Sequence, residues 1–315
     1  MKILLTGSSG FIGHRLSEVL TENGLSVVGC VRTSSQAEKM PIDTVIVEDI
    51  ASFNYWNDVL KEIDVIIHLA AISHDTKSVN NIDRINAVNL HATLMLGKYA
   101  VEENISRFIY ISSIGVLGDS TTRIKFNNRS EYNPKNSYWN SKMEAEIGLK
   151  KITKKTEMEL VIIRPPLIYG PGAPGNFDRL IRLVDTGMPL PLGAMNKKKS
   201  MISLDNLCDF LMNITTKVLP NQFIELNVSD GHDWSTVELI NTIYKYLKKR
   251  NLLFYMPISI LIIIAFLLGK LKEIRKMSVP LLIDEEDTNK VINWTPVQSA
   301  QEGVRLSVEY YLKHK

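Results

Sequence analysis

The chain has 315 residues, of which 45% are hydrophobic and 23% charged, and both values are close to the average of globular proteins. A disordered chain, a collagen and a coiled coil are therefore excluded as global descriptions. The formal net charge of +3 gives no argument for nucleic acid as a partner. Two cysteines, Cys30 and Cys208, are too few for a disulfide framework or a structural zinc site. We therefore expect a reducing compartment and no metal.

Strand and helix patterns alternate through the first half of the chain. Short apolar runs predict strands at residues 2–6, 26–31, 45–47, 65–67, 108–111 and 160–164. Apolar residues at helical spacing predict helices at residues 11–22, 54–63, 79–103 and 137–155. Unalternating apolar strands are typical of parallel sheets that are buried on both faces. The pattern therefore predicts an α/β fold, a Rossmann-like doubly wound parallel sheet with helices on both faces.

A glycine-rich turn lies between the first predicted strand and the first predicted helix. Gly7, Gly10 and Gly13 give the spacing GxxGxxG, with Phe11 and Ile12 opening the helix. Such glycines allow a tight turn, a close approach of backbone N–H groups to a pyrophosphate, and packing of the helix on the strand. The positive end of the helix dipole favours the same anion. The turn therefore predicts a dinucleotide site.

The end of the second strand indicates which dinucleotide. NAD sites usually place a carboxylate there, which binds the ribose 2′-hydroxyl. This chain has Arg32 and no acidic residue between Glu22 and Glu38. A guanidinium can bind a 2′-phosphate bidentately. We therefore expect NADP(H), with NAD(H) as the alternative.

The alternation of strands and helices ends near residue 168. Loops rich in proline and glycine follow at residues 169–175 and 188–193, and helices are predicted at residues 176–185, 204–215 and 235–249. We predict a dinucleotide-binding domain over residues 1–168. A smaller, mostly helical substrate-binding region over residues 169–315 is expected to be interleaved with it.

An uncharged apolar segment at residues 252–268 complicates this description. Its length is at the lower limit for a helix that spans a bilayer, and Pro257 and Ser259 interrupt its first third. We expect a buried or interfacial helix, with a membrane span as the alternative. The apolar run at residues 3–5 is too short for a signal peptide. We therefore expect a cytoplasmic protein, with attachment to the inner face of the membrane as the alternative.

Tyr138 and Lys142 form a YxxxK motif on a predicted helix, where positions i and i+4 share a face. A cation beside a phenol lowers the pKa of the phenol, as a general acid/base near neutral pH requires. Ser112 and Ser113 end a strand about 25 residues upstream, at the edge where parallel strands deliver residues to a cofactor. The three segments together predict a catalytic group.

With these motifs the chain resembles the extended short-chain dehydrogenases/reductases, in the NAD-dependent epimerase/dehydratase branch that modifies nucleotide sugars. The resemblance runs nearly end to end. Besides the glycine turn and the YxxxK motif, it rests on residues 48–50 (EDI), 68–71 (HLAA), Asn89, 112–118 (SSIGVLG) and 164–172 (RPPLIYGPG).

The resemblance implies a role for each matching residue. Tyr138 would be the acid/base, Lys142 would lower its pKa and hold the nicotinamide ribose, and Ser113 would bond the reacting sugar oxygen. Asn176 would contact the diphosphate of the substrate. The cofactor would lie against Gly7, Gly10, Phe11, Ile12, Gly13, Arg32, Asp49, Ile50, Leu69, Ala70, Ala71, Asn89, Tyr138, Lys142 and Pro165.

The resemblance also narrows the reaction. Dehydratases of this branch carry an Asp-Glu pair after the catalytic hydroxyl, whereas Ile114 and Gly115 follow Ser113 here. Redox chemistry at C4 of a UDP-hexose remains. We expect reduction of a UDP-4-keto-6-deoxy-N-acetylhexosamine for surface polysaccharide, such as O-antigen or capsule. A UDP-glucose or UDP-N-acetylglucosamine 4-epimerase is the alternative, and a non-catalytic dinucleotide sensor is an alternative of another class. The expected partner is a UDP-sugar, and a homodimer is compatible with the sequence.

Overall fold

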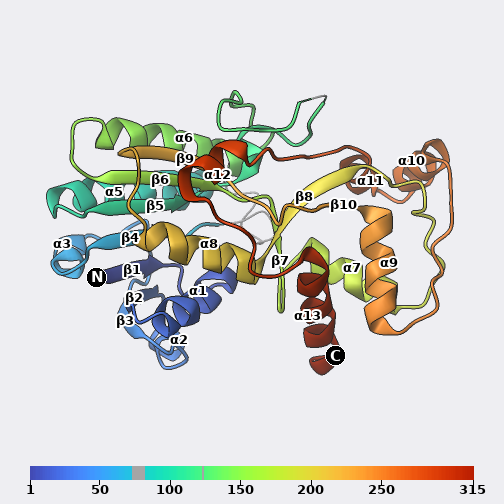
Figure 1. Ribbon diagram of the computed structural model, residues 1–315, viewed down its shortest axis with the longest axis horizontal. Helices are drawn as coiled ribbons and strands as arrows, with labels where there is room; N and C mark the ends of the chain where they lie inside the picture. Colours follow the sequence, from blue (N-terminus) through green and yellow to red (C-terminus); the bar gives the residue numbers. More distant parts are fainter. Residues whose placement is uncertain (73–81, 123) are drawn as a thin grey trace.

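A seven-stranded sheet forms the centre of the computed structural model, which describes residues 1–72, 82–122 and 124–315 (Figure 1). All its neighbouring strands are parallel, in the order β3-β2-β1-β4-β5-β6-β9. The strands are β1 (Lys2–Thr6), β2 (Ser26–Val31), β3 (Asp43–Ile46), β4 (Val65–His68), β5 (Arg107–Ile111), β6 (Glu159–Arg164) and β9 (Phe223–Asn227). The predicted Rossmann-like sheet is confirmed. The strand order reverses beside β1, which is where such sheets bind ligands.

Helices cover both faces of the sheet, and alternate side chains of β1 show the two layers. Ile3 and Leu5 belong to the core beneath α1 (Phe11–Glu22) and α8 (Leu204–Thr216). Leu4 belongs to the core on the opposite face of the sheet. That layer contains α3 (Trp56–Leu60), α5 (Thr93–Glu102) and α6 (Ser137–Thr153). A short α2 (Ser34–Ala37) follows β2.

The helix predicted at residues 79–103 is divided in the structure. It consists of α4 (Ile82–Asn86), a π-helical turn η2 (Ala87–Ala92) and α5, while residues 79–81 lie outside the described residues. π-helical turns are rare and are frequent at functional sites. The interruption places Asn89 in the widened turn.

The second half of the chain builds a smaller lobe with its own core. Its sheet has the order β10-β8-β7, in which β7 and β8 are parallel and β10 is antiparallel to β8. Its elements are β7 (Leu167–Tyr169), α7 (Asn176–Asp185), β8 (Lys198–Ser203), β10 (Asp233–Ser235), α9 (Thr236–Leu247), α10 (Ile258–Leu267), α11 (Leu271–Met277) and α13 (Ala300–Lys313). Two short helices lie outside it: η3 (Ile114–Val116), which follows β5, and α12 (Glu286–Ile292), whose Ile292 joins the core of the large sheet. The sequence pattern missed this sheet because its strands are short and partly polar.

The chain crosses between the two parts more than once. After the small lobe begins, α8 returns to pack beneath the large sheet, and β9 then pairs with β6 as its last strand. The chain after residue 168 therefore contributes to both sheets and to both cores.

The apolar segment at residues 252–268 forms α10 and the chain before it. Leu261 and Ala265 are the helix residues that are buried, and Leu261 joins the core of the small lobe. The expectation of a buried helix therefore holds for one side of α10, and the remaining apolar side chains are largely exposed. Within the described residues, no helix has both the length and the apolar character needed to cross a membrane.

Substitution of Phe210 tests the return of α8 to the large sheet. The Phe210 ring is fully buried beneath the sheet and packs edge-on against Trp294 at 5.1 Å between ring centroids. Phe210→Ala is expected to lower the free energy of unfolding by about 3–5 kcal/mol, because it leaves a cavity under the sheet. Urea denaturation measures this loss. Val218→Ala, at an 89% exposed residue after α8, serves as the control and should leave stability unchanged.

Candidate active site

The glycine turn brings α1 against the end of β1. Gly7 has φ +71°, and a Cβ there would lie 2.9 Å from the Ala70 backbone nitrogen. A Cβ at Gly13 would overlap the Gly7 carbonyl oxygen. Gly10 caps α1 and has no side chain that could bond the N–H groups of the first turn. Those N–H groups and the helix dipole form a cradle that fits the pyrophosphate of a dinucleotide.

The end of β2, beside the glycine turn, is exposed to solvent and carries the cationic side chain of Arg32. Arg32 is exposed, and its backbone N–H donates to the Gln36 Oε1 atom at 2.9 Å. The side chains around it line a shallow hollow formed by Arg32, Thr33, Ser34, Gln36, Ile46 and Glu48. The guanidinium is thus available to a phosphate at this point of the sheet edge.

Asp49, which was expected at the adenine, is held by a residue that the sequence analysis did not identify. Arg84 donates two hydrogen bonds of 2.9 Å to its carboxylate, and the backbone N–H of Ala51 donates a third of 3.0 Å. The Arg84 guanidinium holds the pKa of the Asp49 carboxyl below its usual value. The neighbouring Ile50 packs against the core on the α3 side of the sheet.

A buried hydrogen-bond chain connects the glycine turn to the helix layer through His68. The His68 ring bonds the Thr6 hydroxyl at 2.8 Å through Nδ1 and the Thr93 hydroxyl at 2.9 Å through Nε2. Because the Thr93 hydroxyl donates to the Asn89 carbonyl, the histidine donates from Nε2 and accepts at Nδ1. Burial lowers the pKa of His68 to about 3, with Lys142 adding to the effect, so the ring is neutral.

The same chain anchors the loop after β4 beside the glycine turn. The Ala70 N–H donates to the Thr6 hydroxyl at 3.2 Å, and the Leu69 N–H donates to the Thr6 carbonyl at 3.3 Å. Leu69 and Ala70 are half-buried, whereas Ala71 is exposed. These expected cofactor residues therefore line one wall of the turn.

Lys142 is 2% exposed, and its ammonium lies against β5. It donates to the Ile111 carbonyl at 2.8 Å and lies 4.7 Å from the centre of the Tyr110 ring. Burial lowers the pKa of Lys142 to about 7, although the Glu146 carboxylate opposes the effect. The amine is therefore close to its titration point at neutral pH.

Tyr138 lies one turn before Lys142 on α6 and is half-buried. Burial raises the pKa of Tyr138 to about 12. That Lys142 lowers this pKa stays a prediction, since in the protein alone the pKa of Tyr138 lies above its ordinary value. The physical reason is that desolvation of the phenolate outweighs any attraction, and the Lys142 ammonium is directed to the Ile111 carbonyl.

Ser113 caps the short helix η3 directly after β5. Its Oγ accepts a hydrogen bond from the Gly115 N–H at 3.2 Å, and a Cβ at Gly115 would overlap the Trp139 ring. The Ser113 loop thus contacts the first turn of α6, which carries Tyr138. By contrast, Ser112 is buried, and its hydroxyl has no partner among the described residues.

Pro165 supports the Ser113 loop from the neighbouring strand. It follows β6, and its carbonyl accepts the backbone N–H of Ile114 at 3.0 Å. Pro165 therefore lies beside the Ser113 loop, and its contact with the cofactor stays a prediction. Asn89 lies behind the same region and is engaged by protein groups. Its amide bonds the Ile72 backbone at 2.8 and 3.1 Å and the Ser141 hydroxyl at 3.2 Å.

A buried ion pair, which the sequence analysis missed, holds α6 against β6. Arg164 and Glu146 are 2% and 0% exposed, and the guanidinium donates to the carboxylate at 2.6 Å. The guanidinium also pairs with Glu225 on β9, and the Tyr132 hydroxyl donates to Glu146 at 2.8 Å. Glu146 stands one turn after Lys142, so the pair fixes the turn that carries the amine. The YxxxKxxxE spacing places Glu146 on the Lys142 face of α6, whereas its pairing with Arg164 depends on the fold.

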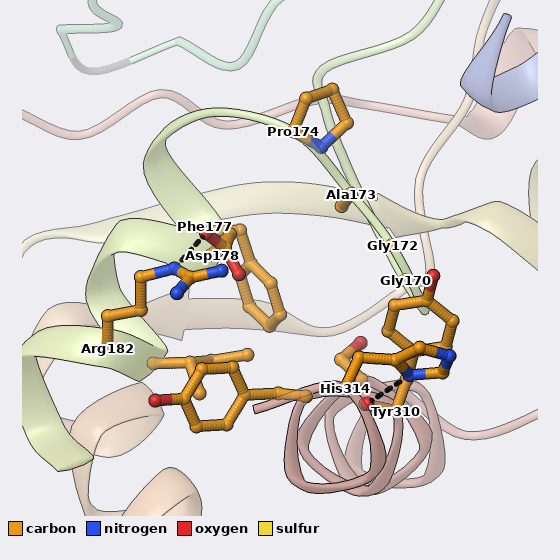
Figure 2. A pocket seen from close by; sticks show the side chains of 12 residues that line it. Gly170, Gly172, Ala173, Pro174, Phe177, Asp178, Arg182, Tyr310 and His314 are labelled. Carbon is orange, nitrogen blue, oxygen red and sulfur yellow. Dashed lines mark hydrogen bonds and ion pairs between the residues drawn. The ribbon is translucent and has the colours of Figure 1, made fainter.

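Asn176, expected at the substrate diphosphate, is exposed at the first position of α7. A cavity of about 250 Å³ lies close by, between α7 and the end of α13 (Figure 2). Figure 2 shows the Arg182–Asp178 pair of 2.6 Å on one side of it and His314 on the other. Neither Asn176 nor the catalytic candidates line this cavity, which is formed by Gly170, Gly172, Ala173, Pro174, Phe177, Asp178, Ile181, Arg182, Ser307, Tyr310, Tyr311 and His314.

The described residues contain no group of three or more His, Cys, Asp or Glu side chains that could hold a metal ion. Both cysteines are free and buried.

A family model decides the class of protein. Residues 3–220 match the model of the NAD dependent epimerase/dehydratase family. The chain belongs to this family. It is a short-chain dehydrogenase/reductase enzyme of the extended type, as the motifs predicted.

Individual relatives agree with this assignment. A UDP-glucose 4-epimerase of Vibrio cholerae is 34% identical over 99% of this chain and 95% of its own length. An N-acetyl-α-D-glucosaminyl-diphospho-ditrans,octacis-undecaprenol 4-epimerase of Escherichia coli O157:H7 is 25% identical over 81% of this chain and 75% of its own length. The solved UDP-glucuronic acid 4-epimerase of Bacillus cereus, in complex with NAD, has a TM-score of 0.81 at 20% identity. That likeness covers 100% of this chain and 99% of the Bacillus chain.

The lowered pKa of Lys142 predicts a pH dependence of stability. The unfolded chain keeps an ordinary lysine pKa near 10.5, so between about pH 7 and pH 10.5 it binds one proton more than the folded protein. Stability relative to Lys142→Met is therefore expected to rise with pH in this window, by up to ~1.4 kcal/mol per pH unit. Urea denaturation of both dinucleotide-free proteins at pH 7, 8 and 9 measures it. A difference between the two proteins that stays constant with pH contradicts the assignment.

Proposed function

We propose that this enzyme is an NAD-dependent 4-epimerase acting on a UDP-hexose. The observation that carries the proposal is the similarity to the Vibrio UDP-glucose 4-epimerase over almost the whole of both chains. The residues expected at the reacting atoms support it, since Ser113, Tyr138 and Lys142 are all present and stand on neighbouring elements.

The chain's own groups suit a proton transfer at the sugar 4-oxygen. NAD, when bound at the glycine turn, would supply the hydride acceptor and donor. Tyr138, with a pKa of about 12, is protonated at neutral pH and can donate to an oxygen that becomes negative. To act as a base it needs positive charge beside it, which the protonated Lys142 can contribute. Ser113, on a loop in contact with α6, would hydrogen-bond the same oxygen.

Elimination of water is not part of the proposal. Ile114 is buried and apolar, and Gly115 packs under the Trp139 ring, so the positions after Ser113 offer neither an acid nor a base. The lobe around α7 would hold the UDP group, with Asn176 at the diphosphate. The E. coli relative, which by its name acts on an undecaprenol-linked sugar, supports a place in surface polysaccharide synthesis.

The dinucleotide is proposed to be NAD(H), because NAD is the one in the complexes of the solved relatives. One observation favours a second candidate, a 4-ketoreductase that uses NADP(H). Arg32 is exposed at the end of β2, where it could bind a 2′-phosphate. In that case the substrate would be a UDP-4-keto-6-deoxy-N-acetylhexosamine.

Two incubations distinguish the candidates. Purified protein is mixed with UDP-glucose or UDP-N-acetylglucosamine without added dinucleotide, and separately with a UDP-4-keto-6-deoxy-N-acetylhexosamine and NADH or NADPH. An epimerase inverts C4 of each of the first two sugars with no external cofactor. A reductase leaves them unchanged and consumes one equivalent of reduced dinucleotide with the keto sugar. Absence of both reactions overturns the proposal.

Tyr138→Phe tests the acid/base group. Removal of the hydroxyl is expected to lower kcat by about 10²–10⁴-fold with little change in substrate binding, since the phenol acts on the transferred proton. Steady-state kinetics and calorimetric titration with UDP measure the two effects. Tyr55→Phe, at a 71% exposed tyrosine on the loop before α3, is the matched control. A Tyr138→Phe enzyme with full turnover would revive the non-catalytic sensor.

Arg32→Ala tests the choice of dinucleotide. If Arg32 binds a 2′-phosphate, its removal weakens NADPH binding by about 10–100-fold and leaves NADH binding nearly unchanged, because one charge-assisted contact is lost. Fluorescence titration of the two reduced dinucleotides measures this. Equal effects on both would place Arg32 at a part of the dinucleotide that they share.

A further inference from the structure

Helix α10 exposes an apolar surface at the far end of the small lobe. Figure 1 shows α10 and α11 at the end of the molecule away from the N-terminus. Ile263, Phe266 and Leu267 are 62%, 69% and 77% exposed. Together with neighbouring residues they form a surface that we call the α10 cap, which consists of Phe254, Tyr255, Ile260, Ile263, Ile264, Phe266, Leu267 and Leu268.

The cap extends around most of the helix. At about 100° per residue, the exposed helix positions span roughly 200° of its circumference. Leu261 and Ala265, one turn apart, hold the helix on the lobe from the remaining side. A helix that is apolar on all sides is typical of a protein interior or a membrane. Here the interior of the protein covers only one side of α10. Exposed apolar patches of this kind mark interaction sites.

Positive charge lies beside the cap, on the side of α11. Lys270, Arg275 and Lys276 are exposed there and form a basic rim, and the acidic Glu273 lies among them, 3.9 Å from the Lys270 ammonium. Residues 240–272 contain no Asp or Glu. Lys248 and Arg250 are exposed at the C-terminal end of α9, next to Lys249, whose ammonium pairs with Asp185 at 2.5 Å. A basic rim beside an apolar surface complements a membrane with anionic headgroups and an apolar interior.

The helix of the cap is too short to cross a bilayer. Ten helical residues are about 15 Å long, half the ~30 Å of a hydrocarbon core. Pro257 caps the helix at its start, and Gly269, with φ +66°, turns the chain back into α11. The segment thus enters and leaves on the same side.

We propose that the α10 cap is a membrane-binding surface that inserts into the headgroup region of an anionic phospholipid bilayer. The proposal does not depend on the reaction proposed above. A second copy of the chain is a weaker occupant, because two packed helices bury one face of each, whereas the cap exposes more than half of the circumference. The basic rim would also bring like charges together in such a pair.

Vesicle flotation of the full chain tests the proposal. Binding to vesicles of 70% phosphatidylcholine and 30% phosphatidylglycerol is expected to exceed binding to pure phosphatidylcholine by about tenfold and to fall with added salt. Ile263→Ser/Phe266→Ser/Leu267→Ser should lower the partition coefficient by about tenfold or more, because it removes the inserted area. Val218→Ser/Val297→Ser, at two exposed residues outside the cap, is the matched control. Both variants should keep the melting temperature and the dinucleotide binding of the original chain.

A second measurement reports on insertion itself. Phe266→Trp is expected to gain fluorescence that brominated phosphatidylcholine in mixed anionic vesicles quenches, beyond the quenching of the chain's own tryptophans. Absence of vesicle binding overturns the proposal, as does binding that the triple variant retains. Sedimentation velocity identifies the other occupant, since a dimer that the triple variant converts to a monomer would show that a second copy covers the cap and would also overturn it.

Discussion

The first helix begins directly against the end of the first strand, and this close approach constrains everything at the site. Because a Cβ at Gly13 would overlap the Gly7 carbonyl, and a Cβ at Gly7 would crowd Ala70, side chains at either position would push α1 or the β4 loop away. The first-turn N–H groups of α1 face the same turn. The cradle that we expect to hold the pyrophosphate therefore needs glycine at these two positions as much as it needs the N–H donors.

Burial of charge fixes the position of α6. Lys142 and Glu146 lie one turn apart on α6, the first against the β5 carbonyl edge and the second paired with Arg164 on β6. Removing one partner of such a pair would leave a charge in a dry interior, so the helix has little freedom to rotate or slide. The same dryness lowers the pKa of Lys142 and raises that of Tyr138, so the two pKa values lie further apart than in water.

The small lobe carries two surfaces for which we propose different partners. The end near α7 is proposed to bind the nucleotide sugar, and the opposite end carries the α10 cap with its basic rim. If the cap binds a membrane, the enzyme works close to the surface where polysaccharide precursors are assembled on lipid. The charge pattern of residues 240–272 would then keep the enzyme near its proposed class of substrate.

Local patterns in the sequence determined the strand and helix alternation, the glycine turn and the Tyr138/Lys142 spacing, because each depends on residues close together in the chain. Contacts between distant residues decided the rest. The Arg84–Asp49 pair, the Thr6–His68–Thr93 chain and the Arg164–Glu146 pair each join segments that no local pattern relates. The tertiary structure also decided that α8 and β9 belong to the large sheet and that α10 has one buried side, because burial and pKa depend on what packs against a residue and not on its neighbours in sequence.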